Sequence, residues 1–343
     1  MNAVWRARAS SMTISGSRSM TTRREIVFGL GALAGLMSLP SLARAGADDL
    51  TRISGRAFGT RWQVTVPADA DARKIGADLR HLLAGIDHSM SPFRAGSELS
   101  RFNSRSEITP FAASEPLRTV ASKALEIARL TGGAFDPAVG PAVHRYGFGP
   151  IAAGRSGRYT AFAVSAEGLS KAEPELSLDL CGIAKGYAVD RLAGHLRDQG
   201  LPSFLIEVGG EVYGFGARPD GRPWRVGIAD PLRTGVHTTL PLTGVAMATS
   251  GDAINAYEIA GRRYSHTIDP ATGEPVRNSV ASVSVLAPTA LEADAFATAL
   301  LVMGPEGGLA FASANRLPAL YLLREAGGLK ARANRLFIDQ GRA

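Results

Sequence analysis

A carboxylate and a hydroxyl stand four residues apart in the run Leu291–Thr298, at Asp294 and Thr298. Residues at i and i+4 share one face of a helix, and the other residues on this face are apolar or small. An acid on a buried face must be paired or must bind a metal. Carboxylate, hydroxyl and carbonyl oxygens are the ligands that Mg²⁺ prefers. The spacing alone also allows an Asp294 that faces water, with Thr298 bonded to the preceding turn, and the pattern by itself favours this arrangement.

A second candidate is the segment from Asp179 to Lys185, where a polar strand end passes through Gly182 into a helix. Such a junction presents backbone N–H groups, and a lysine in the first helical turn suits a phosphate. The segment lacks the pattern of a P-loop, so a tight turn followed by a solvated Lys185 fits as well. Cys181 is interpreted as a small buried residue.

A third candidate is the pair His266 and Asp269, which follows a predicted strand and precedes a Pro-Gly turn. A carboxylate that orients an imidazole makes it a general base. A lone histidine is more often structural, so the pattern by itself leaves both interpretations open.

The helices that would carry these residues are marked by spacing and caps. Apolar residues recur every three or four positions in 72–90, which predicts an amphipathic helix. A second helix begins at Pro116 and ends at Gly132, a third spans Ile183–Gln199, and the capping box Thr289–Glu292 opens a fourth that extends to about Met303.

Strands are predicted between these helices. They are Arg61–Val66, Leu176–Leu180 and Ser203–Val208, followed by a hairpin at Tyr257–Ser265 and a C-terminal strand, turn and strand. Because helices and strands alternate irregularly, the sequence predicts a mixed α/β or α+β fold.

Composition limits the class of protein. The chain has 343 residues, of which 45% are hydrophobic and 20% charged, and it has one cysteine. It can bury a full core, and it is neither a disordered chain, a disulfide scaffold nor a cysteine-ligated zinc protein. The net charge is +7, but six arginines and one acid lie in residues 1–45 and account for five of those charges. The nearly neutral remainder gives no support for a nucleic-acid partner.

Residues 1–45 have the layout of an export signal. Arg23 and Arg24 precede the uncharged, glycine-containing run Ile26–Ala43, and an A-x-A cleavage pattern ends at Ala45. This is typical of the twin-arginine route, and Met20 would give a more compact start than Met1. We expect residues 46–343 to form one periplasmic domain with no stable membrane insertion after signal removal. The alternative is an inner-membrane anchor formed by an uncleaved signal.

Several runs, in order over nearly all of residues 55–323, resemble the ApbE family of flavin transferases. Gly132–Pro141 is very close to the family's G-A-F-D-P-T-V-G-P, and Asp179–Asp190 resembles D-L-x-G-I-A-K-G-Y-A-V-D. The other matching runs are Gly55–Thr60, Ser89–Phe93, Ser97–Asn103, Ile206–Glu211, Pro223–Ile228, Ala248–Asp252, Tyr264–Gly273 and Ala287–Thr298. Eight or more motifs in register make the resemblance specific.

The resemblance implies a single compact two-lobed α+β domain of the flavin-transferase (T-fold-like) type. It implies an Mg²⁺-dependent FAD:protein FMN transferase, which splits FAD, joins FMN through a phosphoester to a Thr or Ser of an acceptor protein, and releases AMP. The implied metal ligands are Gly182, Asp294, Ala297 and Thr298, and the implied catalytic residues are His266, Lys185 and Asp269. The implied contacts to FAD are Phe58, Phe93, Ala134, Phe135, Asp136, Asp179, Lys185 and Ile268. Phe58 and Phe93 replace the family's Met and Tyr, so Phe93 has no hydroxyl to offer the cofactor.

Two other functions remain compatible with these residues. One is an FAD pyrophosphatase, which gives FMN and AMP by using water in place of the acceptor hydroxyl. The other is a non-catalytic periplasmic flavin-binding carrier, although a carrier has no need of a metal. The family resemblance suggests that the acceptor is a flavoprotein subunit of a membrane electron-transport complex, such as a sodium-pumping quinone reductase.

Overall fold

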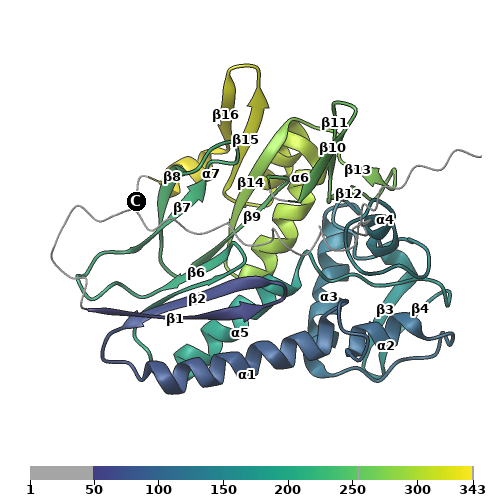
Figure 1. The fold of residues 1–343 in the computed structure, drawn as a ribbon, viewed down its shortest axis with the longest axis horizontal. Coiled ribbons are helices and arrows are strands. Elements are labelled where there is room, and N and C mark those ends of the chain that lie inside the picture. The colour runs from purple at the N-terminus through teal and green to yellow at the C-terminus, as the bar shows by residue number, and fades with distance from the viewer. Residues whose placement is uncertain (1–48, 254, 342–343) are drawn as a thin grey trace, which may run out of the picture. The chain divides into compact units, whose positions relative to one another are not determined.

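An eight-stranded antiparallel sheet forms the centre of the protein (Figure 1). The computed structural model describes residues 49–253 and 255–341, which belong to one compact unit, and the predicted leader lies outside them. The strand order is β1-β2-β5-β6-β9-β14-β15-β16, and every neighbouring pair is antiparallel. The strands are β1 (Leu50–Ala57), β2 (Thr60–Pro67), β5 (Phe204–Val208), β6 (Glu211–Phe215), β9 (Val245–Gly251), β14 (Val280–Ala287), β15 (Ala319–Glu325) and β16 (Gly328–Ala333). The fold is therefore α+β, as predicted.

Helices cover one face of this sheet. Helix α1 (Ala72–Met90) packs on β1, α5 (Ala184–Asp198) on β5 and β6, and α6 (Ala290–Ala314) on β9 and β14. Helix α3 (Glu115–Leu130) joins the same core beside α1 and α6. The other face is covered by the hairpin of β7 (Trp224–Ala229) and β8 (Val236–Leu242) and by α7 (Arg335–Gln340).

Alternation along the strands divides the apolar residues between the two faces. Tyr213 and Ala248 lie in the core on the helix side, whereas their neighbours Val212 and Met247 lie in the smaller core under the β7–β8 hairpin. This period of two is the signature of a sheet buried on both sides. It explains why β14, in the middle of the sheet, is buried at every position.

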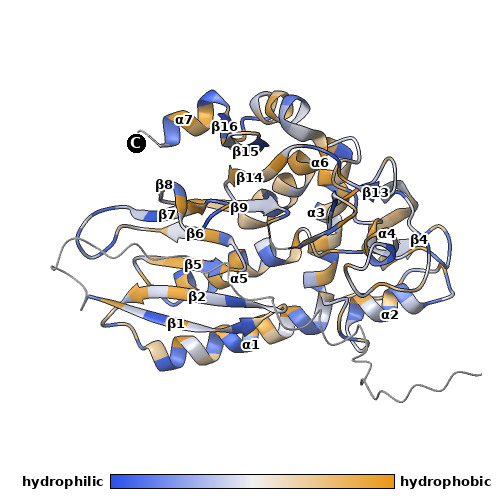
Figure 2. Ribbon diagram, turned by 45° about the horizontal axis from the view of Figure 1, so that its top comes forward, coloured by the Kyte–Doolittle hydropathy of each residue, from blue (hydrophilic) through white to orange (hydrophobic). Residues whose placement is uncertain are grey.

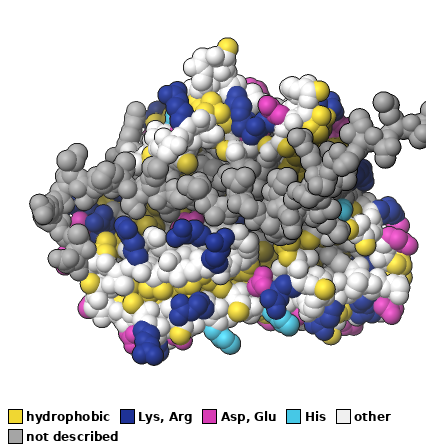
Figure 3. Space-filling model, viewed as in Figure 1, with side chains coloured by type: hydrophobic (Ala, Val, Ile, Leu, Met, Phe, Trp, Pro, Cys, Tyr) yellow, Lys and Arg dark blue, Asp and Glu magenta, His cyan; other side chains and the backbone are white. Residues whose placement is uncertain are grey.

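Smaller elements surround the helix-side core. They are α2 (Glu98–Ser104), α4 (Gly140–Arg145), β3 (Phe162–Ser165), β4 (Gly168–Lys171), β10 (Ala256–Ile259), β11 (Arg262–Ser265), β12 (Ile268–Asp269) and β13 (Glu274–Pro275), with a 3₁₀ turn at Tyr159–Ala161. In the view of Figure 3, Lys and Arg side chains lie in several separate groups among acidic and apolar ones. The described residues visible in this view form no single basic surface.

The four predicted helices are present, but the last is longer than expected. Gly304 adopts φ 72, and Pro305 follows it, so α6 is kinked there and continues to Ala314. Proline suits the first turn of the new helical segment because it has no N–H to satisfy. The hydroxyl of Tyr321 donates to the carbonyls of Leu300 at 2.8 Å and of Gly304 at 3.1 Å, which satisfies oxygens freed by the kink.

Helix α6 is apolar along most of its length (Figure 2). Within the described residues it is the one helix long and apolar enough to cross a membrane, and half of its most apolar window is buried inside the protein. Its packing against β9 and β14 accounts for that composition.

The strand predicted at Leu176–Leu180 is wrong. Its three leucines are buried as the alternation indicated, but among the described residues the segment forms only a single bridge, between Leu176 and Arg155. The backbone of Leu178 instead pairs with the side-chain amide of Asn103, which donates to its carbonyl and accepts from its N–H, both at 2.8 Å. Side-chain pairing of this kind satisfies the backbone N–H and C=O groups of an extended segment that is not part of a sheet.

Candidate active site

Helices α5 and α6 cross in close contact at Gly186. A Cβ at this position would lie 2.2 Å from the carbonyl oxygen of Ala290, so only glycine permits the approach. The carboxylate of Asp190 on α5 accepts hydrogen bonds from the backbone N–H groups of Ala290 at 2.8 Å and Leu291 at 2.9 Å. An acid at a helix N-terminus satisfies free donors and complements the helix dipole. The two helices are thus held together where their candidate residues lie.

This crossing brings Lys185 and Asp294 together. The Asp294 side chain is buried, and its Oδ2 accepts a hydrogen bond from the N–H of Gly186 at 3.0 Å. The Nζ of Lys185 lies 3.4 Å from Oδ1 and 3.5 Å from Oδ2 of Asp294. The alternative in which Asp294 faces water is therefore excluded by its position in the fold.

Glu211, at the start of β6, completes this cluster. Its Oε1 lies 2.8 Å from the Nζ of Lys185. Burial alone lowers the pKa of Lys185, but the charges of Asp294 and Glu211 outweigh burial and raise it, so the ammonium stays protonated. Burial raises the pKa of Glu211, the charge of Lys185 opposes that rise, and the nearby charge of Asp294 adds to it. Two buried carboxylates thus share one ammonium.

Thr298 and Gly182 meet beside the cluster. Thr298 lies one turn beyond Asp294 on α6, and its Oγ1 is 3.4 Å from the Oγ of Ser250 on β9. A Cβ built on Gly182 would lie 3.2 Å from that Oγ1 and 3.3 Å from Cε2 of Phe135. Ala297, next to Thr298, is fully buried.

The oxygen donors fit a hard cation. Asp294, Thr298 and the backbone near Gly182 supply carboxylate, hydroxyl and carbonyl oxygens, which is the chemistry that Mg²⁺ accepts. In the part of the chain that the structure describes, no three His, Cys, Asp or Glu side chains gather into a metal site. An ion here would therefore depend on hydroxyl and backbone oxygens besides Asp294.

The buried Asp136 and the partly buried Asp179 shape the loops around Gly182. Asp136 accepts from the N–H groups of Ala138 at 2.9 Å and Tyr159 at 3.1 Å, and Asp179 accepts from that of Cys181 at 2.9 Å. Burial raises the pKa of both carboxyls, and the hydrogen bonds oppose that rise. These acids hold their loops in place through backbone contacts.

The remaining residues expected to contact FAD differ in exposure. Phe135 and Ile268 are buried, and Ala134 and Phe58 are partly buried against the core. Phe58 has φ 53 in the turn between β1 and β2. The Phe93 ring is 67% exposed. Cys181 is also exposed, so the expectation of a buried cysteine is wrong. Its backbone N–H donates to the Asp179 carboxylate in a tight turn, and this turn leaves Cys181 at the surface.

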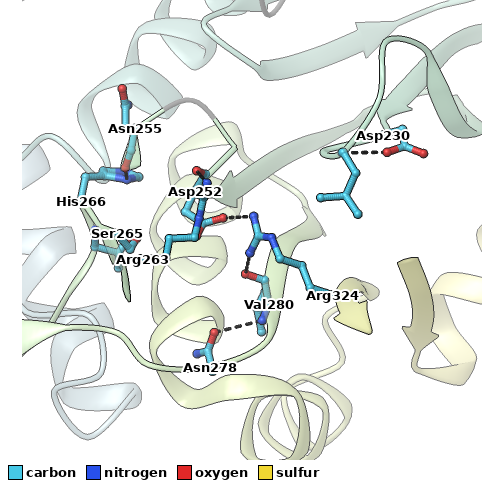
Figure 4. Close-up of polar contacts among 11 residues, drawn as sticks. Asp230, Asp252, Asn255, Arg263, Ser265, His266, Asn278, Val280 and Arg324 are labelled. Carbon is cyan, nitrogen blue, oxygen red and sulfur yellow. Dashed lines mark hydrogen bonds and ion pairs between the residues drawn. The ribbon is translucent and has the colours of Figure 1, made fainter. Parts of the chain in front are cut away.

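His266 follows β11 and is held by a backbone carbonyl. Its Nδ1 lies 3.1 Å from the carbonyl oxygen of Asn255 (Figure 4). A carbonyl only accepts, so Nδ1 carries the proton and Nε2 keeps its lone pair. Burial lowers the pKa of His266, and the positive charge of Lys185 lowers it further, so the imidazole is neutral near pH 7.

Asp269 does not contribute to this orientation. Its carboxylate accepts from the N–H of Ala271 at 2.9 Å in its own turn. The sequence suggested Asp269 as the partner of His266, whereas the structure gives that part to the carbonyl of Asn255. A backbone carbonyl has no signal in the sequence, because every residue carries one.

The hairpin that precedes His266 is fixed to the sheet by a second charged cluster (Figure 4). Asp252 is buried, its Oδ2 lies 2.6 Å from Nε of Arg263 on β11, and its Oδ1 pairs with Arg324 on β15. Arg324 also donates to the carbonyl of Val280 at 3.0 Å. Charge-assisted contacts of this kind are strong and directional.

Sequence reasoning missed Glu211 and Ser250 as members of the site. Both lie in glycine turns flanked by acids and hydroxyls, at Val208–Glu211 and Thr249–Asp252, but such turns are common in any antiparallel sheet. Only the sheet order, which puts β6 beside β9, shows that they face the same helix.

The antiparallel α+β domain holds an ammonium between two buried acids and has a histidine with a free Nε2, a set of groups suited to group transfer. The model of the ApbE family matches residues 58–321, and the chain belongs to that family.

Two relatives cover most of the chain. The FAD:protein FMN transferase of Vibrio cholerae is 38% identical over 326 residues, which cover 90% of this chain and 97% of the relative. The FAD:protein FMN transferase of Escherichia coli K12 is 34% identical over 290 residues, which cover 78% of this chain and 82% of the relative.

Solved structures show the same fold. The flavin transferase ApbE from Vibrio cholerae superimposes with a TM-score of 0.78 at 36% identity, over 85% of this chain and 99% of that one. The apo form of the flavinyl transferase ApbE from Pseudomonas stutzeri superimposes with a TM-score of 0.78 at 32% identity, over 86% of this chain and 98% of that one.

Proposed function

We propose that this chain transfers FMN from FAD to a Thr or Ser of an acceptor protein and releases AMP. The observation that carries the proposal is the buried Asp294 beside Lys185, with Thr298 one helical turn beyond it. His266 adds an imidazole whose hydrogen bond to Asn255 leaves Nε2 free. Family membership and the names of its relatives support the same reaction.

The reaction is a displacement at phosphorus. The acceptor hydroxyl oxygen attacks the phosphorus of the FMN half, and a new P–O bond forms. The bond to the bridging oxygen breaks, and that oxygen leaves with AMP. His266 takes the hydroxyl proton on Nε2, which its hydrogen bond to Asn255 keeps free. Lys185 offers positive charge to the phosphates from a cluster where its ammonium stays protonated.

A magnesium ion fits the oxygen donors of the site. The ligands we propose are the Asp294 carboxylate, the Thr298 hydroxyl and the backbone oxygens of Gly182 and Ala297. When bound, Mg²⁺ would neutralise charge that develops on the phosphate oxygens. Phe58, Phe93, Ala134, Phe135, Asp136, Asp179 and Ile268 are proposed to line the place of the flavin and adenine rings.

The place of action is a further part of the proposal. We propose that residues 1–45 direct export by the twin-arginine route and that the enzyme works in the periplasm. The proposed acceptor is a flavoprotein subunit of a membrane electron-transport complex. Amino-terminal sequencing of the exported protein tests the signal, since cleavage predicts a chain that begins at Gly46 and an anchor predicts an intact leader.

One incubation distinguishes the three functions that the sequence left open. The full chain is mixed with FAD, Mg²⁺ and an acceptor protein, and the products are separated by denaturing gel and chromatography. A fluorescent acceptor band together with AMP is the expected result. Free FMN and AMP without a labelled acceptor would indicate a pyrophosphatase, and unchanged FAD would indicate a carrier.

A further inference from the structure

Glu211 is a buried acid that the proposed reaction does not use. Its side chain is 4% exposed, and its Oε1 lies 2.8 Å from the ammonium of Lys185. Its Oε2 is buried and has no hydrogen-bond partner within the described residues. An unpaired buried carboxylate oxygen is costly, so it calls for a reason.

Lys185 lies between two acids but is unequally shared. Its Nζ is 2.8 Å from Glu211 and 3.4 Å or more from Asp294. Asp294 already uses Oδ2 for the N–H of Gly186, so its Oδ1 faces the ammonium. That Oδ1 is the atom most available to a cation, and the ammonium now occupies its vicinity.

The stem of Lys185 is guided toward Glu211 by the turn that precedes β6. A Cβ on Gly209 would lie 3.4 Å from Cδ of Lys185 and 2.8 Å from Cγ2 of Thr60. The aliphatic part of the Lys185 side chain therefore passes close to Gly209, two residues before Glu211. The ammonium has three donors, and Oε2 of Glu211 is a buried side-chain acceptor without a partner among the described residues.

We propose that Glu211 is the counter-ion that receives the Lys185 ammonium when a divalent cation takes Asp294. An ammonium and a divalent cation repel each other and compete for one carboxylate. Full transfer of Nζ to Glu211 relieves that competition and gives Oε2 its missing donor. Glu211 is thus a positioning residue that sets the affinity of the cation site through Lys185. This inference rests on the proposed function.

The test measures Mg²⁺ binding by calorimetry to the full chain without FAD. In Glu211→Gln the ammonium keeps only Asp294 as its anion, so Mg²⁺ is expected to bind about tenfold more weakly. Glu207→Gln is the matched control, because its carboxylate accepts from Gly210 nearby, at 2.9 Å, while Lys185 pairs with Glu211 and Asp294. That control should bind Mg²⁺ within about twofold of wild type. Glu211→Asp keeps a carboxylate and should restore most of the affinity.

A second background shows whether Glu211 acts through Lys185. In Lys185→Met the competitor is gone, so Mg²⁺ should bind more tightly than to wild type, and Glu211→Gln should then cost less than about threefold. Equal losses in both backgrounds would mean that Glu211 acts on the ion directly and would overturn the proposal. Unchanged affinity in Glu211→Gln would also overturn it. A wild-type protein that binds no Mg²⁺ would overturn the metal assignment of the proposed function as well.

Discussion

The close contact of α5 with α6 at Gly186 predicts that one added methyl group damages the site more than the fold. A Cβ in Gly186→Ala would lie 2.2 Å from the Ala290 oxygen and 2.7 Å from Cα of Leu291, where real Cβ contacts stay above 3.0 Å. Both are backbone atoms, so the two helices must separate by about 0.8 Å or more. The N–H of Gly186 holds Asp294, and Lys185 is its neighbour, so the displacement falls on the site itself.

The magnitudes separate the two effects. Overpacking costs about 1–3 kcal/mol, and the helix propensity of alanine offsets about 1 kcal/mol of it. The net loss of stability is then at most about 2 kcal/mol, whereas a shift near 1 Å in a catalytic constellation lowers the rate about 100-fold. We therefore expect a folded Gly186→Ala protein that transfers FMN very slowly.

The assay compares the transfer rate to a fluorescent acceptor with thermal unfolding of the same samples. Gly194→Ala is the control on the same helix, because nothing lies within 4 Å of its added Cβ. It should gain about 0.5–1 kcal/mol of stability and keep its rate. A Gly186→Ala enzyme with wild-type rate would refute the view that this contact sets the geometry of the site.

Four further predictions concern three single residues. Asp294→Ala should abolish Mg²⁺-dependent transfer, as measured by acceptor fluorescence; full activity would remove it from the metal site. His266→Ala should leave FAD affinity unchanged and slow transfer by about 10²–10⁴-fold. Because burial lowers the pKa of His266, the wild-type rate should fall only in acid below the ordinary imidazole range; a fall near pH 7 would contradict this. Burial raises the pKa of Asp190 to about 6, above the ordinary 3.8, because it outweighs the hydrogen bonds from Leu291 and Ala290. Ionisation of Asp190 therefore costs folding free energy, and stability is greatest below pH 4 and falls as pH rises through 6. Relative to Asp190→Asn, the wild type should lose up to about 3 kcal/mol of unfolding free energy between pH 4 and pH 7, as measured by urea unfolding.

The helices and their caps were predictable because their signals are local. The apolar spacing of 72–90 matches the observed α1, and Thr289 accepts from the N–H of Glu292 at 3.2 Å as the capping box required. The hairpin at Tyr257–Ser265 turns at Ala260 and Gly261, which both have positive φ. A cap or a two-residue turn is decided within a few residues, so the chain itself specifies it.

The sequence by itself also determined that Asp294 and Thr298 share a face, since helical geometry fixes the i, i+4 relation. It did not determine what that face meets. The tertiary structure decided three things. Helix α5 contacts α6 at Gly186, and Glu211 on β6 and Ser250 on β9 lie beside the same helix. His266 pairs with the carbonyl of Asn255 and not with Asp269. These contacts join residues far apart in the chain, and several use backbone atoms that every residue has. Sheet order and helix packing decided them, because only those bring such groups within hydrogen-bond distance.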